Sequence, residues 1–81
     1  MNVQIRLFAV ARELAGVDTI EVSLGEPYNV AELRRALAAQ VPALAGLLPQ
    51  VLFAIGSQYV NDGTVVPADA EVACIPPVSG G

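Results

Sequence analysis

The residues that could take part in chemistry most directly are the last six, from Pro76 to Gly81. Two prolines end any regular structure before them, because proline has no N–H for a strand ladder and fixes its own φ. Small residues follow, and Gly80 and Gly81 place bare backbone beside the last carboxylate. We expect this segment to offer that carboxylate to another molecule. The alternative is a frayed end without a role, although a final Gly-Gly pair arises by chance in only about one chain in two hundred.

The rest of the chain has few groups that could catalyse a reaction. It contains no lysine and no histidine, and Cys74 is its single cysteine. Metal sites need several ligands, and a cysteine without histidine cannot form a Cys/His dyad. The absence of lysine also leaves no side-chain acceptor for an isopeptide bond. We therefore expect that the chain is not an enzyme on its own and binds no cofactor.

The composition predicts one small domain that acts with a partner. The 81 residues are 54% hydrophobic and only 15% charged, which is more apolar than an average domain. The net charge is −4, and the four basic residues are arginines that form no patch, which argues against nucleic-acid binding and favours a basic partner. A single cysteine fits a reducing cytoplasm, and neither a signal peptide nor a membrane-spanning run is evident.

The hydrophobic pattern predicts an α+β domain over residues 1–75, followed by a flexible tail over residues 76–81. Alternation and apolar runs indicate five strands, at residues 2–10, 18–24, 51–55, 58–60 and 71–75. Asn29, with Glu32 three residues later, predicts the capped start of the one long helix, which ends before Pro42. We expect this helix to pack on one face of a mixed sheet whose first and last strands pair in parallel at the centre.

Three shorter segments complete the predicted structure. A single helical turn is expected at residues 11–15, stopped by Gly16, and a short helix or 3₁₀ turn at residues 42–49. The strand at 51–55 is almost entirely apolar, which predicts that it is buried on both faces or nearly so.

The outer face of the predicted sheet carries apolar residues where polar ones are expected. Phe8 falls on the same face as Arg6, and Ile75 falls on the face opposite Cys74, which we expect to be a small buried residue. Parallel pairing of the first and last strands would bring Phe8 and Ile75 together, with Tyr59 as a third member. An exposed apolar patch at the base of the tail would be a docking surface. The alternative for Phe8 is a position beneath a loop.

The whole chain resembles the family of molybdopterin synthase small subunits. These subunits are sulfur carriers with a β-grasp (ubiquitin-like) fold. Three motifs account for the resemblance: Phe8-Ala9-x-x-Arg12-Glu13-Leu14-x-Gly16, Asp69-x-Glu71-Val72 and Pro76-Pro77-Val78-Ser79-Gly80-Gly81. Two turns depart from the family pattern. Gly56-Ser57 stands where Asn-Gly is common, and Asp69-Ala70 stands where a glycine usually follows the acidic residue.

The resemblance implies a role for the tail. A partner activating enzyme of the E1 type would use ATP to adenylate Gly81, and sulfur from a donor protein would replace AMP to leave a thiocarboxylate. The large catalytic subunit would then use this sulfur to build the dithiolene of molybdopterin, within a heterotetramer. Gly80 would give steric access, because a narrow channel rejects a Cβ at either of the last two positions.

The candidate interface residues are Phe8, Tyr59, Ile75, Pro76, Pro77, Val78 and Ser79. Arg12 is a further candidate that could anchor the tail or an acidic group of a partner, although a surface ion pair with Glu13, Glu71 or another nearby acid is simpler. Two other functions stay open. Thiamine-pathway sulfur carriers and ubiquitin-like protein modifiers share the fold and the Gly-Gly end, and a plain interaction module with an incidental tail is the third reading.

Overall fold

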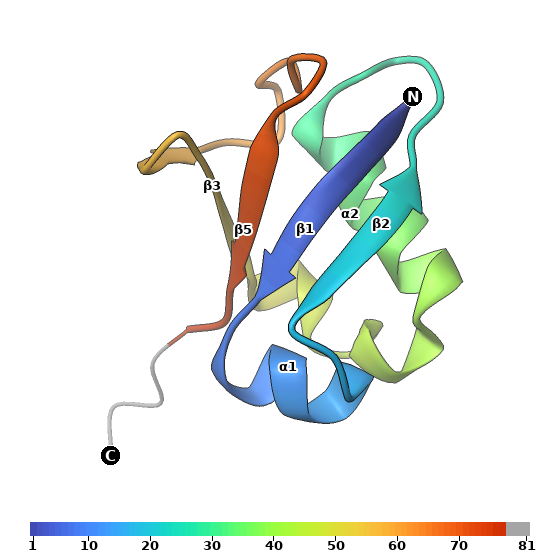
Figure 1. Cartoon of the computed structure of the whole chain (residues 1–81), viewed down its shortest axis with the longest axis vertical. Helices are drawn as coiled ribbons and strands as arrows, with labels where there is room; N and C mark the ends of the chain where they lie inside the picture. The colour runs from blue at the N-terminus through green and yellow to red at the C-terminus, as the bar shows by residue number, and fades with distance from the viewer. Residues whose placement is uncertain (78–81) are drawn as a thin grey trace.

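The computed structural model describes residues 1–77, so Val78, Ser79, Gly80 and Gly81 lie outside the described residues. Five strands form one mixed sheet in the order β2-β1-β5-β3-β4 (Figure 1). The strands are β1 (Asn2–Leu7), β2 (Thr19–Ser23), β3 (Leu52–Ile55), β4 (Gln58–Val60) and β5 (Glu71–Ile75). The helices are α1 (Ala9–Ala15) and α2 (Val30–Gln40), and two 3₁₀ turns follow them, η1 (Pro42–Leu44) and η2 (Leu48–Gln50). Within residues 1–77, no helix has the length and hydrophobicity needed to cross a bilayer.

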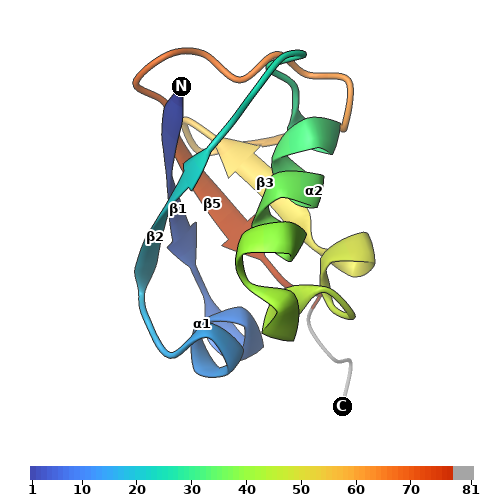
Figure 2. The same ribbon diagram turned by 90° about the vertical axis from the view of Figure 1, so that its right-hand side faces the viewer.

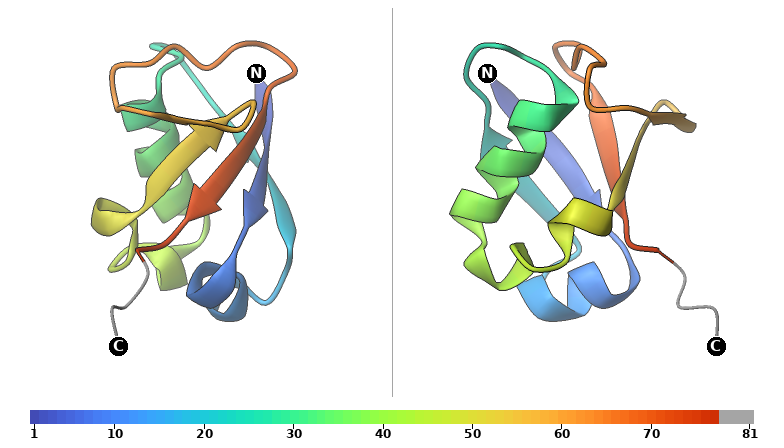
Figure 3. Two further views of the ribbon diagram at one scale, coloured as in Figure 1. Left: turned by 90° about the vertical axis from the view of Figure 1, so that its left-hand side faces the viewer. Right: turned by 180° about the vertical axis from the view of Figure 1, so that it is seen from behind.

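The first and last strands pair at the centre of the sheet, as expected. β1 and β5 run parallel, with Ile5 opposite Val72 and Leu7 opposite Cys74. β2 is antiparallel to β1, and β3 is antiparallel to both β4 and β5. Figure 3 shows β5 between β1 and β3. The predicted α+β class is confirmed.

One face of this sheet is covered by α2, and the other is left open (Figure 2). The Asn29 side chain accepts a hydrogen bond of 2.9 Å from the backbone N–H of Glu32, so the predicted cap is present. Val30, Leu33 and Leu37 recur at helical spacing and are buried against the sheet. The amphipathic pattern of α2 therefore fixes which face of the sheet becomes the core and which stays available.

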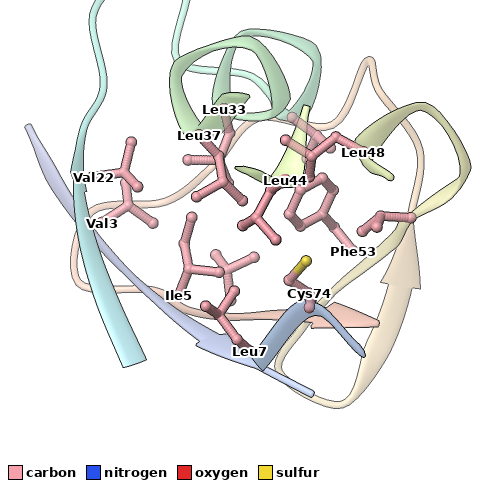
Figure 4. Packing of buried hydrophobic residues seen from close by; sticks show 14 of the residues in the cluster. Val3, Ile5, Leu7, Val22, Leu33, Leu37, Leu44, Leu48, Phe53 and Cys74 are labelled. Carbon is pink, nitrogen blue, oxygen red and sulfur yellow. The ribbon is translucent and has the colours of Figure 1, made fainter. Parts of the chain in front are cut away.

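The core consists of alternate residues of the strands, closed by α2 and the 3₁₀ turns (Figure 4). Phe53 and Ile5 are fully buried at its centre. Cys74 is also fully buried, as predicted, and this burial raises the pKa of its thiol to about 11, with the Arg34 charge opposing the rise. The thiol is therefore a protonated packing group at neutral pH.

Arg34 ties four parts of the fold together, a role that the sequence did not suggest. Its Nη1 donates to the carbonyls of Leu48 and Val51, the latter at 2.7 Å. Its Nη2 donates to the Asp62 carboxylate at 2.8 Å, and its guanidinium carbon lies 4.9 Å from the centre of the Phe53 ring. One side chain thus joins α2 to η2, to the start of β3 and to the turn after β4.

Two expectations about element boundaries and burial were wrong. The first strand ends at Leu7 rather than continuing to residue 10, because α1 already begins at Ala9. The strand at 51–55 is not buried on both faces, because Leu52 is 51% exposed. The reason is that the helices cover only one side of the sheet, so an outward side chain of β3 has no layer above it (Figure 2).

The turns use left-handed backbone where the sequence departs from the family pattern. Gly56 and Ser57 both have positive φ, at 58° and 69°, which suits the two-residue hairpin between β3 and β4. Asp69 has a φ of 63° before β5, and Gly16 ends α1 with a φ of 77°. Both turns that depart from the family pattern thus contain left-handed backbone in this chain.

Candidate docking surface at the root of the tail

The tail begins at the end of the central strand β5. β5 ends at Ile75, after which Pro76 is buried and Pro77 is exposed. Pro76 therefore packs with the body of the domain, and Pro77 is the first residue after β5 whose side chain faces solvent. Gly81, which is predicted to react, and Gly80, which is predicted to give steric access, lie outside the described residues together with Val78 and Ser79.

A groove of 810 Å³ runs over the open face of the sheet. The middle of the groove is formed by four residues that lie opposite one another on four neighbouring strands. Arg6 of β1 lies opposite Ala73 of β5, Ala73 lies opposite Ala54 of β3, and Ala54 lies opposite Tyr59 of β4. The two methyl side chains form a low floor, because much larger side chains stand on either side of them.

The structure brings together the three residues that were predicted to form an apolar patch. Phe8, Tyr59 and Ile75 all line this groove. Tyr59 is 67% exposed and Phe8 is 40% exposed, so neither is a core residue. Ile75 lies at the end of β5 beside the tail root. The alternative of Phe8 beneath a loop does not hold, because its ring borders an open groove.

Leu52 adds an apolar side chain that the sequence analysis missed. It lies opposite Ile75 in the β3–β5 ladder and is half exposed. The alternation of side chains along a strand could have predicted this exposure. Leu52 and Ala54 point to one face of the sheet, and the buried Phe53 between them points to the other. The uniformly apolar run concealed this alternation.

The polar rim of the groove carries nearly balanced charge. The Arg6 guanidinium lies 5.8 Å from the centre of the Phe8 ring and 4.0 Å from a carboxylate oxygen of Glu71. Both charged side chains are mostly exposed, so the ion pair contributes little to stability. The cation nevertheless extends the surface of Phe8 with a flat group that can itself pack against a partner.

Arg12 forms the simple surface pair that was considered for it, with a different acid from those named. Its Nε lies 3.7 Å from an Asp18 carboxylate oxygen, and both side chains are well exposed. Arg12 lines a second hollow of 500 Å³ next to the groove, which shares Arg6, Phe8 and Glu71 with it. Its place near the docking surface is clear, and its role in binding stays a prediction.

The groove is the candidate docking surface of the described residues. Within residues 1–77 no three His, Cys, Asp or Glu side chains gather so that they could hold a metal ion. Cys74 is buried and protonated, as described above.

A five-stranded mixed sheet with parallel central strands that wraps one main helix is the β-grasp, or ubiquitin-like, fold.

The comparisons with known proteins agree with this fold and with the tail motif. The model of the ThiS family matches residues 5–81, and the chain belongs to this family. The molybdopterin synthase sulfur carrier subunit of Chlamydomonas reinhardtii is 35% identical over 83 residues, which cover the whole of both chains. The resemblance expected from the sequence is confirmed.

Two solved structures extend the comparison. SAMP1, a small archaeal modifier protein from Haloferax volcanii, superposes with a TM-score of 0.85 at 27% identity, and the match covers all of both chains. A complex of subunits 1 and 2 of the molybdopterin-converting factor from Helicobacter pylori contains a chain that matches with a TM-score of 0.68 at 22% identity, again over the full length of both. At that identity the second match shows the shared fold alone.

Proposed function

We propose that this chain is the sulfur carrier subunit of a molybdopterin synthase and that it carries sulfur as a thiocarboxylate on Gly81. The observation that supports this most is the match to sulfur carrier subunits over the entire chain, including the Gly80-Gly81 end. The structure supports this role through the apolar groove that lies beside the root of the tail.

The chemistry requires an activation step because a carboxylate is a poor acyl donor. In the proposed sequence, an activating enzyme transfers AMP from ATP to the Gly81 carboxylate and releases pyrophosphate. A persulfide of a donor protein attacks the acyl carbon and expels AMP, and a thiol reductant cleaves the resulting S–S bond. Gly81 is then left as a thiocarboxylate. Catalytic side chains and ATP binding belong to the partners, so this chain is the carried substrate.

The tail sequence fits such a role for steric and entropic reasons. Two glycines without Cβ atoms at positions 80 and 81 suit a channel that admits only backbone. The fixed φ of Pro76 and Pro77 reduces the number of conformations at the root of the tail, and this lowers the entropy lost on insertion.

The partner that receives the charged tail is proposed to be the large subunit of the synthase. The Helicobacter pylori complex joins subunits 1 and 2 of the molybdopterin-converting factor through a chain of the same fold, and it suggests a pairing of this kind. Phe8, Tyr59 and Ile75 would form the docking patch on this chain, in a heterotetramer with two large subunits in the cytoplasm. An acidic chain of net charge −4 favours a basic surface on the partner.

Mass spectrometry of the intact chain tests this proposal. After incubation with the activating enzyme, ATP and a persulfide donor, we expect the mass increase that accompanies replacement of one oxygen by sulfur, located at Gly81. A matched chain lacking Gly80 and Gly81 should show no increase and should still bind the large subunit. A wild-type chain that keeps a plain carboxylate, under conditions that charge a known carrier, contradicts the proposal.

A second candidate function is protein modification, favoured by the likeness to SAMP1. In that case Gly81 would form isopeptide bonds with lysines of other proteins. Covalent adducts of tagged chain in a cell extract supplied with ATP, absent for the variant without Gly80 and Gly81, would indicate this function. The two functions share activation and differ in the acceptor, so thiocarboxylate formation and adduct formation should be measured in parallel.

A further inference from the structure

We infer that the middle of the groove, floored by Ala54 and Ala73, receives an apolar side chain of the large synthase subunit. On this inference, which rests on the proposed function, the small size of these two residues decides which partner can dock. Phe8, Tyr59 and Ile75 provide contact area, whereas the alanines leave the space that an inserted side chain must fill.

The reach of the tail places the partner over this groove. Only three residues separate Pro77 from Gly81, and an extended chain spans about 3.5 Å per residue, so Gly81 lies within about 14 Å of Pro77. A partner that takes Gly81 into its active site must therefore cover the surface around the tail root. Ile75, two residues before Pro77, lines the end of the groove.

The shape of the groove favours an inserted group. The centre of a protein interface packs about as tightly as a protein interior, so a partner that covers this open groove contacts its floor best through a protruding side chain. Ala54 is only 8% exposed, even though its methyl group is on the open face of the sheet, and the larger Tyr59 stands directly opposite it on β4. A side chain that reaches this floor is fully desolvated, which is the environment of the residues that dominate binding energy.

The charge distribution favours an apolar inserted side chain. Arg6 and Glu71 lie 4.0 Å apart on the rim and largely cancel each other. The floor is apolar because it consists of the two alanines, and Phe8, Tyr59 and Ile75 add apolar surface around it. A charged side chain would lose its hydration here without a buried partner of opposite sign, and an aromatic or branched aliphatic one would not.

Filling the groove from this side tests the inference. Ala73→Leu adds bulk at the floor on the outward face of β5 and removes no core contact, and Ala73→Val adds less. Ser23→Leu is the matched control, because Ser23 is exposed on the same face of the sheet at its far edge in β2. For each chain we would measure the Kd for the purified large subunit by calorimetry, the thermal midpoint Tm, and charging of Gly81 by mass spectrometry.

We expect Ala73→Leu to weaken binding to the large subunit by roughly tenfold or more and Ala73→Val by less, with Ser23→Leu equal to wild type. The Tm of the Ala73→Val chain should stay close to that of the wild type, which keeps the test valid should the leucine variant unfold. Unchanged binding by a folded Ala73→Leu or Ala73→Val chain overturns the inference. Loss of charging with retained binding to the large subunit also overturns it, because the groove would then serve the activating enzyme. Failure of the wild-type chain to become charged would instead refute the proposed function, and the binding data would be unaffected.

Discussion

Leu52 of β3 lies directly opposite Ile75 of β5, so a half-exposed leucine borders the last strand residue before the tail. This pair extends the apolar surface of the groove toward the tail root. We predict that Leu52→Thr weakens binding to the large subunit by about fivefold, or about 1 kcal/mol, with little change in Tm. Titration calorimetry and a thermal melt measure both. Val65→Thr serves as the control, because Val65 is exposed on the loop that bridges to Asn29. A large fall in Tm for Leu52→Thr would show that the residue is part of the core.

Phe8→Ala tests the aromatic side of the groove. We expect the Kd for the large subunit to rise by about tenfold. The substitution removes an aromatic contact residue and also removes the ring against which the Arg6 guanidinium packs. The Tm should fall by only a few degrees, since the ring is 40% exposed in the free chain. Leu14→Ala is a comparable truncation of an exposed apolar residue that does not line the groove. Equal effects of the two substitutions on binding would contradict the assignment.

Arg34→Lys should destabilise the fold, although it keeps the charge. Lysine cannot reproduce the planar fork that bonds the Leu48 and Val51 carbonyls and Asp62 at once. Leaving those acceptors unsatisfied should lower the free energy of unfolding by about 2 kcal/mol, measured by urea denaturation. Arg35→Lys is the control, because Arg35 is exposed and its partner among residues 1–77 is Glu32, one turn earlier. Matching losses in both variants would disprove the bracing role of Arg34.

The buried thiol of Cys74 predicts a loss of stability at high pH. Its pKa is about 11 in the folded chain, against a reference value of 9.0, so the unfolded chain releases the thiol proton first as the pH rises. The stabilising effect of burying the neutral thiol is complete below pH 9 and is lost as the pH rises toward 11, by about 2 kcal/mol in total. Urea denaturation from pH 7 to 11 should show this decline. The Cys74→Ala chain should lack the part of this decline that comes from ionisation of the thiol. Parallel pH profiles of the free energy of unfolding for the two chains would show that the thiol does not cause the decline.

Ala9 is held at a positive φ of 52°, which costs a residue with a Cβ about 1 kcal/mol. Ala9→Gly should therefore keep or raise the free energy of unfolding, even though Ala9 opens helix α1. Ala15→Gly, near the other end of the same helix, should lower it by about 1 kcal/mol. Urea denaturation of both variants decides the matter: a loss at position 9 as large as that at position 15 would mean that the left-handed backbone carries no strain.

The sequence was a good guide wherever local patterns determine structure. Alternation in β5 predicted the inward Cys74 and the outward Ile75, and the Asn29 cap predicted the start of α2. These features depend on residues a few positions apart. The central pairing of β1 with β5 followed from the arrangement of hairpins around a single helix.

The features that the sequence did not reveal all depend on distant contacts. Arg34 contacts carbonyls 14 and 17 residues away, which no local pattern encodes. The groove floor needs the register of four strands, because Ala54 and Ala73 become neighbours only through their ladder. The exposure of Leu52 was missed because an apolar run does not say which face of the sheet stays uncovered.

The buried Pro76 fixes the point from which the tail leaves the domain, and this has a consequence for affinity. Once the chain is docked, the Gly81 carboxylate is confined to a region about 14 Å in radius around Pro77. One group in half of such a sphere corresponds to a local concentration on the order of 0.1 M. A partner's active site therefore meets a concentrated substrate without binding the domain tightly. Under the proposed function, docking of modest strength is sufficient, and it would leave the chain free to pass from the activating enzyme to the large subunit.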